Sequence, residues 1–233
     1  MKVAVMQPYF LPYLGYWQLM AAVDQFVVLE DVNYIARGWV NRNRIWVGGK
    51  EHWMTIPLTN ASQNCHISET LIIEGNEWKK KLMRTVQAAY GKAPFFAEGR
   101  DLVAEILDGS ERSLSAFLER SIRIVAGRLG LTTVIRSSGS MGGAPDLRGE
   151  SRILDICRHL EADIYLNMPG GRDLYQSAAF KEQNVGLNFL QSEWESMELQ
   201  STSGSVTLSL LDLRMHNSTD ILRESLAKCS FKP

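Results

Sequence analysis

The chain has 233 residues, 45% of them hydrophobic, and a formal net charge of -1 at pH 7. This length suits one large domain, or one domain with an insertion, and the apolar content is enough for a buried core. A charge near zero provides no general attraction for nucleic acid or for an anionic membrane surface, so neither partner is expected without a local basic patch.

The cysteines and the N-terminal residues indicate a compartment. Three cysteines stand far apart and form no CxxC motif, which favours reduced thiols over disulfides or a zinc site. Only four apolar residues follow Met1-Lys2 before Gln7-Pro8 interrupts them, and no later apolar run is long enough for a membrane span. We therefore expect a cytoplasmic protein without a signal peptide.

The opening segment predicts a strand, a bent loop, a helix and a second strand. Residues 3–6 form an apolar run of strand length, two prolines prevent a regular helix in the loop that follows, and residues 14–23 can then form a helix. Residues 26–29 form a second apolar run, which is followed by the acidic pair Glu30-Asp31. Such a βαβ unit requires a right-handed crossover and a parallel sheet that is buried on both faces.

The start of this helix is a candidate ligand site. Gly15 has no Cβ, so a ligand or another backbone can come close to it, and the free N–H groups of a helix N-terminus favour an anion. Gln7, Tyr9, Tyr13 and Tyr16 surround this glycine in the sequence. Gly15 could also serve only to pack the helix against the strand, with the aromatic residues filling space.

The spacing around Gly15 resembles the HxGH nucleotidyltransferases. In those enzymes a strand ends in a loop that leads to two histidines flanking x-Gly at a helix start, and a second strand follows the helix. The corresponding stretch here is Tyr13-Leu14-Gly15-Tyr16. Because both histidine positions are tyrosine, the charge that an imidazolium would donate to a transferring phosphate is lost.

A polar and aromatic segment follows Asp31. Arginine and asparagine side chains supply planar hydrogen-bond donors and aromatic rings supply stacking faces, which together suit a phosphate, a carboxylate or a sugar nucleotide. The candidate binding residues are Tyr34, Trp39, Arg42 and Arg44. Ligands of open parallel sheets bind where the strands end at their carboxyl side, and this segment starts there. A solvated loop could show the same composition.

Residues from about 45 to 130 are predicted to be an insertion between the second and third parallel strands. Gly48-Gly49 indicates a hairpin turn between strands at 44–47 and 51–56, and residues 67–73 alternate like another strand. Helical periodicity and helix stop signals predict three helices, at 76–90, 95–107 and 113–129.

The alternation of strands and helices resumes after the insertion. Strands are predicted at 132–136, 163–166 and 185–190, with helices at 150–160 and up to about 183. Together with the first unit they predict an α/β fold with a doubly wound, mostly parallel sheet of about five strands, Rossmann-like and nucleotidyltransferase-like. We expect one domain at 1–195 and a C-terminal extension at 196–233 packed on it, with a helix at 218–229 and Ser209 to Asp212 docking the tail near the cleft.

Two glycine-rich loops follow successive strands of this predicted sheet. Residues 137–145 present Ser137 and Ser138, and Arg152 lies in the helix that comes next. The second loop contains Gly170, Gly171 and Arg172. Hydroxyl groups and exposed N–H groups beside arginine can bind an anion, so the two loops indicate a cleft, although each could be a simple connector.

The motifs together resemble the WbqC-like protein family. The resemblance rests on MQPYFLPYLGYW at 6–17, DVN at 31–33, WxxRxRI at 39–45, WMTIP at 53–57, the pair Ser137-Ser138, ESRILDIC at 150–157 and ADIYLNMPGG at 162–171. It extends to about residue 213. Members often lie among genes for O-antigen and other surface polysaccharides, which implies a role in making or modifying an activated sugar.

These observations predict a cytosolic group-transfer enzyme, a transferase that binds a nucleotide or nucleotide sugar and transfers an acyl, aminoacyl or nucleotidyl group. Gln7, Tyr16 and Asp31 are the candidate catalytic residues, with Asp31 as the general base or metal contact. The expected partner is a small molecule. No metal site and no cofactor are identified, although Mg²⁺ would suit a bound nucleotide, and the oligomeric state is not indicated.

Two other functions fit the same residues. A non-catalytic sugar-nucleotide-binding or scaffold subunit is favoured by the missing HxGH histidines and by the single candidate base, since bond formation usually needs a base with an orienting partner. An RNA-dependent aminoacyl transferase is supported only by the arginine and aromatic residues at 34–44, and the neutral overall charge opposes it.

Overall fold

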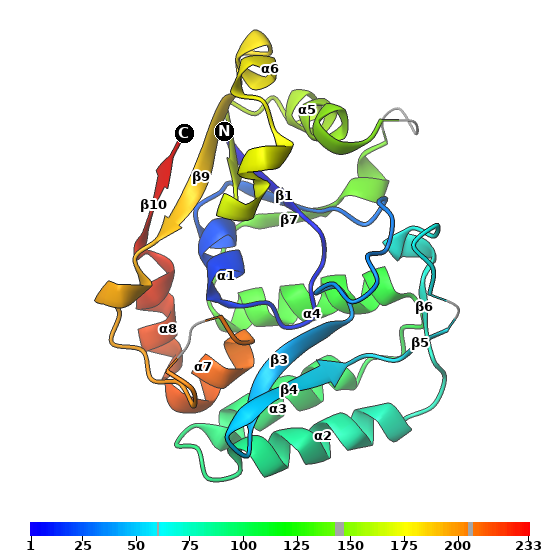
Figure 1. Ribbon diagram of the computed structural model, residues 1–233, viewed down its shortest axis with the longest axis vertical. Coiled ribbons are helices and arrows are strands. Elements are labelled where there is room, and N and C mark those ends of the chain that lie inside the picture. Colours follow the sequence, from blue (N-terminus) through cyan, green and yellow to red (C-terminus); the bar gives the residue numbers. More distant parts are fainter. Residues whose placement is uncertain (60, 143–146, 205–206) are drawn as a thin grey trace.

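The computed structural model describes residues 1–59, 61–142, 147–204 and 207–233, and a six-stranded sheet lies at its centre (Figure 1). β1 and β2 pair in parallel, β7 continues the sheet beyond β2, and β8 and β9 continue it beyond β1. Only β10 runs antiparallel, against β9. In spatial order the strands are β10 (Cys229–Lys232), β9 (Gly186–Ser192), β8 (Ile164–Asn167), β1 (Lys2–Met6), β2 (Gln25–Val28) and β7 (Val134–Ser137).

Helices cover both faces of this sheet because its central strands are apolar on both sides. Val3 and Val5 of β1 belong to the hydrophobic cluster that contains α5 (Gly149–His159) and Phe180 of α6 (Ser177–Glu182). Ala4, on the opposite face, belongs to the cluster that contains α1 (Leu14–Ala21). The predicted fold class, a Rossmann-like α/β fold, is confirmed.

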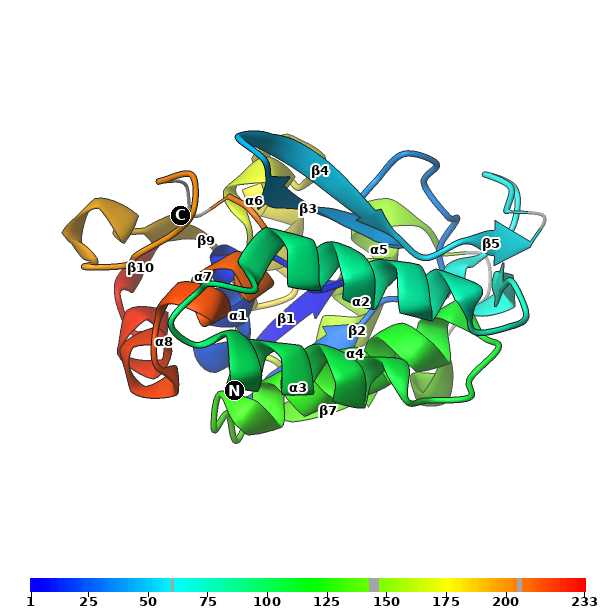
Figure 2. The ribbon, with the colours of Figure 1, turned by 90° about the horizontal axis from the view of Figure 1, so that it is seen from below.

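The insertion between β2 and β7 forms a separate layer. β3 (Arg42–Val47) and β4 (Lys50–Thr55) make the predicted hairpin, which lies over α2 (Glu77–Tyr90) in Figure 2. α3 (Phe96–Leu107) and α4 (Leu114–Arg128) complete the helical segment, and the Ser113 hydroxyl caps α4 by accepting from Ala116 N at 3.4 Å.

One predicted strand of the insertion is wrong in its first half. Residues 67–73 form a 3₁₀ turn, η1 (Ile67–Glu69), and then the short strand β6 (Leu71–Ile72), which pairs with β5 (Leu58–Thr59). The cause is local: Glu69 Oε2 accepts a hydrogen bond from His66 N at 2.8 Å, and the backbone of Glu69 donates to His66 O at 3.1 Å. These bonds close a tight turn and prevent an extended run.

The C-terminal segment joins the sheet. The described part contains α7 (Leu210–His216) and α8 (Thr219–Leu226), and the predicted helix at 218–229 ends three residues early. The chain then forms β10 beside β9, a strand that is not predicted from the sequence. Among the described residues, no helix has both the length and the apolar composition that crossing a membrane requires.

Candidate functional site

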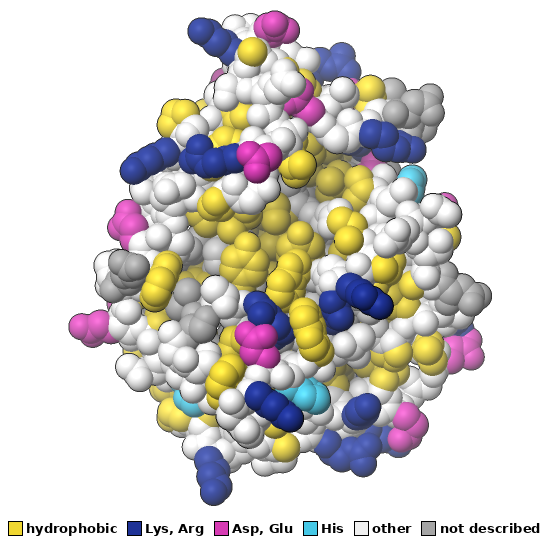
Figure 3. Space-filling model, viewed as in Figure 1, with side chains coloured by type: hydrophobic (Ala, Val, Ile, Leu, Met, Phe, Trp, Pro, Cys, Tyr) yellow, Lys and Arg dark blue, Asp and Glu magenta, His cyan; other side chains and the backbone are white. Residues whose placement is uncertain are grey.

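The chain reverses direction across the sheet between β1 and β8. From β1 it continues to β2 and β7 on one side, and it returns to β8 and β9 on the other. In parallel α/β sheets, ligands bind at the carboxyl ends of the strands that flank such a switch point. Gln7 and Asn167 stand at these two ends. Figure 3 shows that this face is hollowed, with hydrophobic side chains gathered in the hollow and Lys and Arg side chains on its rim.

The loop after β1 is held by two buried side chains from distant segments. Asn43 Nδ2, on β3, donates to Leu11 O at 2.7 Å and to Phe10 O at 3.1 Å. Ser209 Oγ, just before α7, donates to the same Leu11 O at 2.8 Å, and Leu210 N donates to Pro12 O at 3.1 Å. Leu11 has a φ of 46°, which is strained for a residue with a side chain, so these bonds fix a conformation that the loop alone would not favour. These bonds attach the segment at Ser209 to the loop after β1.

The tyrosines of this loop have different environments. Burial raises the pKa of Tyr13 to about 12 and also raises the pKa of Tyr9, so both phenols are neutral donors near pH 7 rather than bases. Neither hydroxyl makes a hydrogen bond to another residue in the described part of the chain, and the same holds for the side-chain amide of Gln7. These three polar groups are available to a ligand.

Tyr16, in contrast, is fully buried. Its hydroxyl donates to Gln7 O at 3.2 Å and its ring packs 5.2 Å from the ring of Phe26, between centroids. Burial raises its pKa well above the usual value for tyrosine. In this conformation Tyr16 holds the loop and does not reach a substrate, so its predicted catalytic role stays a prediction.

Gly15 lies against the segment that follows β8. A Cβ built at Gly15 would stand 3.0 Å from Met168 Cε and 3.0 Å from Tyr13 Cε2, so the glycine lets these side chains approach the start of α1. The first residue before the helix, Tyr13, provides no side-chain cap. Gly15 therefore serves close packing of Met168 and Tyr13 against the first turn of α1.

A second group of predicted residues meets where β2 and β7 end. Ser138 Oγ donates to Asp31 Oδ1 at 2.5 Å, and Arg152 Nη2 donates to Asp31 Oδ2 at 2.7 Å. Arg152 also binds Asp155 Oδ2 at 3.0 Å and the carbonyl oxygen of Ser138 at 3.2 Å. The side chain of Arg152 is 8% exposed and that of Asp31 is 28% exposed. Three separate elements thus converge on one ion pair, which includes Ser138 of the first predicted loop but no residue of the second.

Ser137 stands beside this network. Its hydroxyl donates to Glu30 Oε1, so it does not point freely toward a ligand. Of the predicted loop at 137–145, residues 143–145 lie outside the described part of the chain. The turn after β7 is η2 (Ser138–Met141), in which Ser138 is buried.

The outer face of the β3–β4 hairpin carries arginines stacked on tryptophans. Arg42 Cζ lies 4.0 Å from the ring centroid of Trp53, and Arg44 Cζ lies 4.9 Å from that of Trp39. The two rings are 5.5 Å apart, and Arg44 Nη1 also binds both carboxylate oxygens of Glu51, at 2.8 and 2.9 Å. Trp53, which is not among the predicted site residues, stands directly opposite Arg44 in the hairpin register.

The remaining predicted residues do not join these groups. Tyr34 is 6% exposed, and its hydroxyl donates to Asn41 Oδ1 at 2.8 Å. Arg172, in η3 (Pro169–Leu174), lies 4.6 Å from the ring centroid of Phe189 and donates to the carbonyl oxygen of Pro233 at 2.9 Å, so it fastens the last strand. A Cβ at Gly171 would stand 2.3 Å from Asn167 Nδ2, whereas Gly170 has open space around it.

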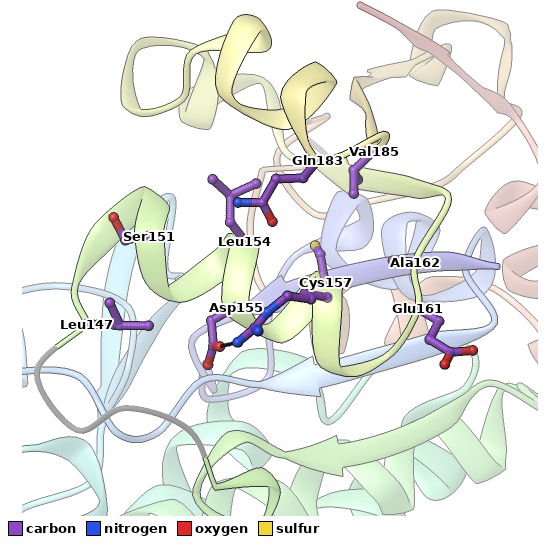
Figure 4. A pocket seen from close by; sticks show the side chains of 10 residues that line it. Leu147, Ser151, Leu154, Asp155, Cys157, Glu161, Ala162, Gln183 and Val185 are labelled. Carbon is purple, nitrogen blue, oxygen red and sulfur yellow. Dashed lines mark hydrogen bonds and ion pairs between the residues drawn. The ribbon is translucent and has the colours of Figure 1, made fainter.

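A cavity of about 700 Å³ lies elsewhere, between α5 and the end of α6 (Figure 4). Leu154 and Gln183 line it, and in Figure 4 the side chain of Asp155 points toward an arginine across a dashed line, which is the 2.6 Å bond from Arg158. None of the predicted site residues lines this cavity. It touches the network at Asp31 only through Asp155. Within the described residues, no group of three His, Cys, Asp or Glu side chains could hold a metal ion.

Comparison with known proteins identifies the family. A model of the WbqC-like protein family matches residues 7–224. "Uncharacterized protein Rv1507c" of Mycobacterium tuberculosis (strain ATCC 25618 / H37Rv) is 31% identical over 215 residues, which cover 91% of this chain and 92% of that protein. No solved structure matches the chain. The resemblance drawn from the motifs is confirmed: the chain belongs to the WbqC-like protein family.

Proposed function

We propose that this protein is a cytosolic group-transfer enzyme that binds a nucleotide or nucleotide sugar at the carboxyl ends of β1 and β8. The transferred group would be acyl, aminoacyl or nucleotidyl, and the reaction would belong to surface-polysaccharide or sugar-nucleotide biosynthesis, as the family resemblance implies. The observation that carries the proposal is the switch point itself. Polar groups of Gln7, Tyr9 and Tyr13 belong to the loop that follows β1 there.

The β3–β4 hairpin, which is joined to the loop after β1 through Asn43, supplies what an anionic, planar ligand needs. Arg42 and Arg44 offer guanidinium groups in a fixed orientation, because each is stacked on a tryptophan. Preorganised donors of this kind stabilise the negative charge that develops during transfer to a phosphate or carbonyl oxygen. Any Mg²⁺ would bind together with the phosphates of the nucleotide. Tyr9 and Tyr13 would act as neutral hydrogen-bond donors that orient the acceptor.

Asp31 is a hydrogen-bonded carboxylate, so it would act as a base only through the lone pairs that its protein partners leave open. Both of its oxygens already accept a hydrogen bond, one from Ser138 and one from Arg152. Its remaining lone pairs and its 28% exposure leave room for one more donor, such as a substrate hydroxyl or amine. The arrangement supports a base that is oriented by Ser138 and Arg152. Turnover that is unchanged in Asp31→Asn would remove Asp31 from the mechanism.

Thermal-shift measurements test the binding step. Nucleoside triphosphates, nucleotide sugars and acyl or aminoacyl donors are compared with and without Mg²⁺, because a ligand at 100 times its dissociation constant stabilises by about 2.7 kcal/mol. We expect a shift with one nucleotide class that is lost in Arg44→Ala. Arg158→Ala is the control, because Arg158 is 75% exposed and lies on α5. A shift that survives in Arg44→Ala, or no shift with any compound, would contradict the proposal.

A non-catalytic sugar-nucleotide-binding or scaffold subunit is the second candidate. The favouring observation is that the groups available at the switch point, on Gln7, Tyr9 and Tyr13, are neutral, whereas the one predicted base, Asp31, lies in an ion pair with Arg152 beyond the end of β2. The phenols of Tyr9 and Tyr13 cannot replace it, because their raised pKa values make them poor bases. Binding of a nucleotide sugar without turnover of any donor, in the presence of candidate acceptors, would favour this second function.

A further inference from the structure

A second pocket lies between β4 and α2, outside the candidate site. It encloses about 380 Å³, which is within the size range of about 300–1,000 Å³ of small-molecule sites. β4 pairs with β3 along one edge, and its residues 52–55 line the pocket together with one face of α2. Figure 2 shows the hairpin and this helix stacked on each other. None of the residues predicted as ligand contacts lines this pocket.

The walls of the pocket are apolar and aromatic. Met54 and Leu82, which are 3% and 5% exposed, contribute from opposite sides, one from β4 and one from α2. Trp78 adds an indole ring from α2, and Trp53, whose ring stacks with Arg42 and Trp39 on the outer face of the hairpin, borders the pocket and is 39% exposed. A hydrophobic or aromatic group that entered the pocket would remove this surface from water.

The charge at the pocket is positive. Three consecutive lysines stand on α2: Lys79 Nζ donates to Gly109 O at 2.6 Å and Lys80 Nζ binds Glu77 Oε1 at 2.8 Å. Lys81 lines the pocket, and its ammonium has no partner in the described part of the chain. No Asp or Glu is among the lining residues. Of the three lysines, the one at the pocket is therefore the one available to an external anion.

We propose that this pocket binds a small hydrophobic carboxylate, with an aryl or branched alkyl group against Trp78 and Leu82 and the carboxylate on Lys81. The inference does not depend on the proposed function, because it uses none of the residues at the switch point. Trp53 nevertheless belongs to both places, since its ring also carries Arg42 at 4.0 Å. A ligand in the pocket that moved Trp53 would therefore also move Arg42 of the candidate site.

Tryptophan fluorescence of the full chain tests the site, with 3-phenylpropionate as the probe and 3-phenylpropanamide as its neutral analogue. We expect saturable quenching by the acid in the millimolar range or below, and weaker quenching by the amide. Trp78→Phe should remove part of the signal. Lys81→Gln should weaken binding about two- to five-fold, the range of an exposed ion pair, while Lys80→Gln, its neighbour paired with Glu77, should not.

Two further variants separate the pocket from the rest of the surface. Thr85→Phe places a ring in the pocket and should abolish the quenching, whereas Ala88→Phe adds the same ring to an exposed position of α2 outside it. Equal quenching in both variants, or no quenching of the wild type, would overturn the proposal. Concentration-dependent dimerisation that only Thr85→Phe prevents, without any binding of the probe, would instead identify a second copy of the chain as the occupant and would also overturn it.

Discussion

Replacing Arg152 with methionine removes the cation that joins the ends of β2 and β7 to α5. The guanidinium of Arg152 donates to Asp31 Oδ2 at 2.7 Å and to Asp155 Oδ2 at 3.0 Å, and its side chain is 8% exposed. Methionine keeps much of the side-chain volume, so the change tests the charge and its hydrogen bonds more than the packing. It leaves two carboxylates without this partner.

The stability that Arg152→Met should lose lies between two limits. Exposed ion pairs contribute about 0–1 kcal/mol, whereas removing one partner of a buried pair costs about 3–5 kcal/mol. Asp155 is 11% exposed but keeps Arg158, and Asp31 is 28% exposed and keeps the Ser138 hydroxyl. Because both carboxylates retain a partner, we expect Arg152→Met to lower the free energy of unfolding by about 2–3 kcal/mol.

Urea unfolding followed by tryptophan fluorescence measures this loss, and α5 provides a matched control. Arg158 binds the same Asp155 at 2.6 Å but is 75% exposed, so Arg158→Met should change stability by less than about 0.5 kcal/mol. A cycle with Asp31→Asn should give a coupling of about 1–2 kcal/mol. Equal losses in Arg152→Met and Arg158→Met, at the same dependence on urea, would refute the reasoning.

Three other properties can be measured on the same protein. Burial raises the pKa of the Cys157 thiol to about 12, so iodoacetamide at pH 8 should not label it in the folded protein and should label it once urea unfolds the chain. Mass spectrometry measures the labelling, and labelling of Cys157 before unfolding would contradict this. Burial raises the pKa of Tyr13 from 10.0 to about 12, so the unfolded chain releases this proton at a lower pH than the folded chain. The free energy of unfolding should therefore fall as the pH rises between these two values, and it should fall less steeply in Tyr13→Phe. Urea unfolding at several pH values measures this, and the same pH dependence in both proteins would contradict it. Asn43→Ala leaves the carbonyl of Phe10 without this donor and that of Leu11 with Ser209 alone, so we expect a loss of about 1–3 kcal/mol in thermal unfolding, with a smaller loss in Ser209→Ala.

The parallel strands of the sheet could be predicted because each is recognisable from its own residues. Residues 3–6 and 26–29 are continuous apolar runs, and such runs form parallel strands that are buried on both faces. β10 carries little signal of its own, since its four residues have one large apolar side chain, Phe231, and it forms because β9 offers a free edge. At Ile67 the sequence was misleading, because the alternation of apolar and polar residues at 67–73 predicted a strand. The hydrogen bond from His66 N to the Glu69 carboxylate forms a turn there instead.

The candidate site was predictable as far as topology determines it. Asp31, Ser138 and Arg152 meet because they follow strand ends on one edge of the sheet, which the order of elements already implied. The directions of the side chains could not be predicted in the same way. Tyr16, one residue beyond Gly15, points into the core, and no pattern in the sequence distinguishes it from Tyr13. Trp53 had a usable signal, because a two-residue turn at 48–49 places residue 53 opposite residue 44.

The structure divides the predicted residues into two groups with different chemistry. Around Asp31 the charges are already paired within the protein, and this group joins strands to α5. At the switch point, Gln7, Tyr9 and Tyr13 offer neutral donors without a partner among the described residues, and the neighbouring hairpin carries the stacked arginines Arg42 and Arg44, of which Arg44 is paired with Glu51. Neutral donors and fixed cations bind an anion and stabilise developing negative charge, but they do not remove a proton. A reaction at the switch point therefore needs either a nucleophile that is already deprotonated or a base that the substrate brings, unless the ligand reaches as far as Asp31.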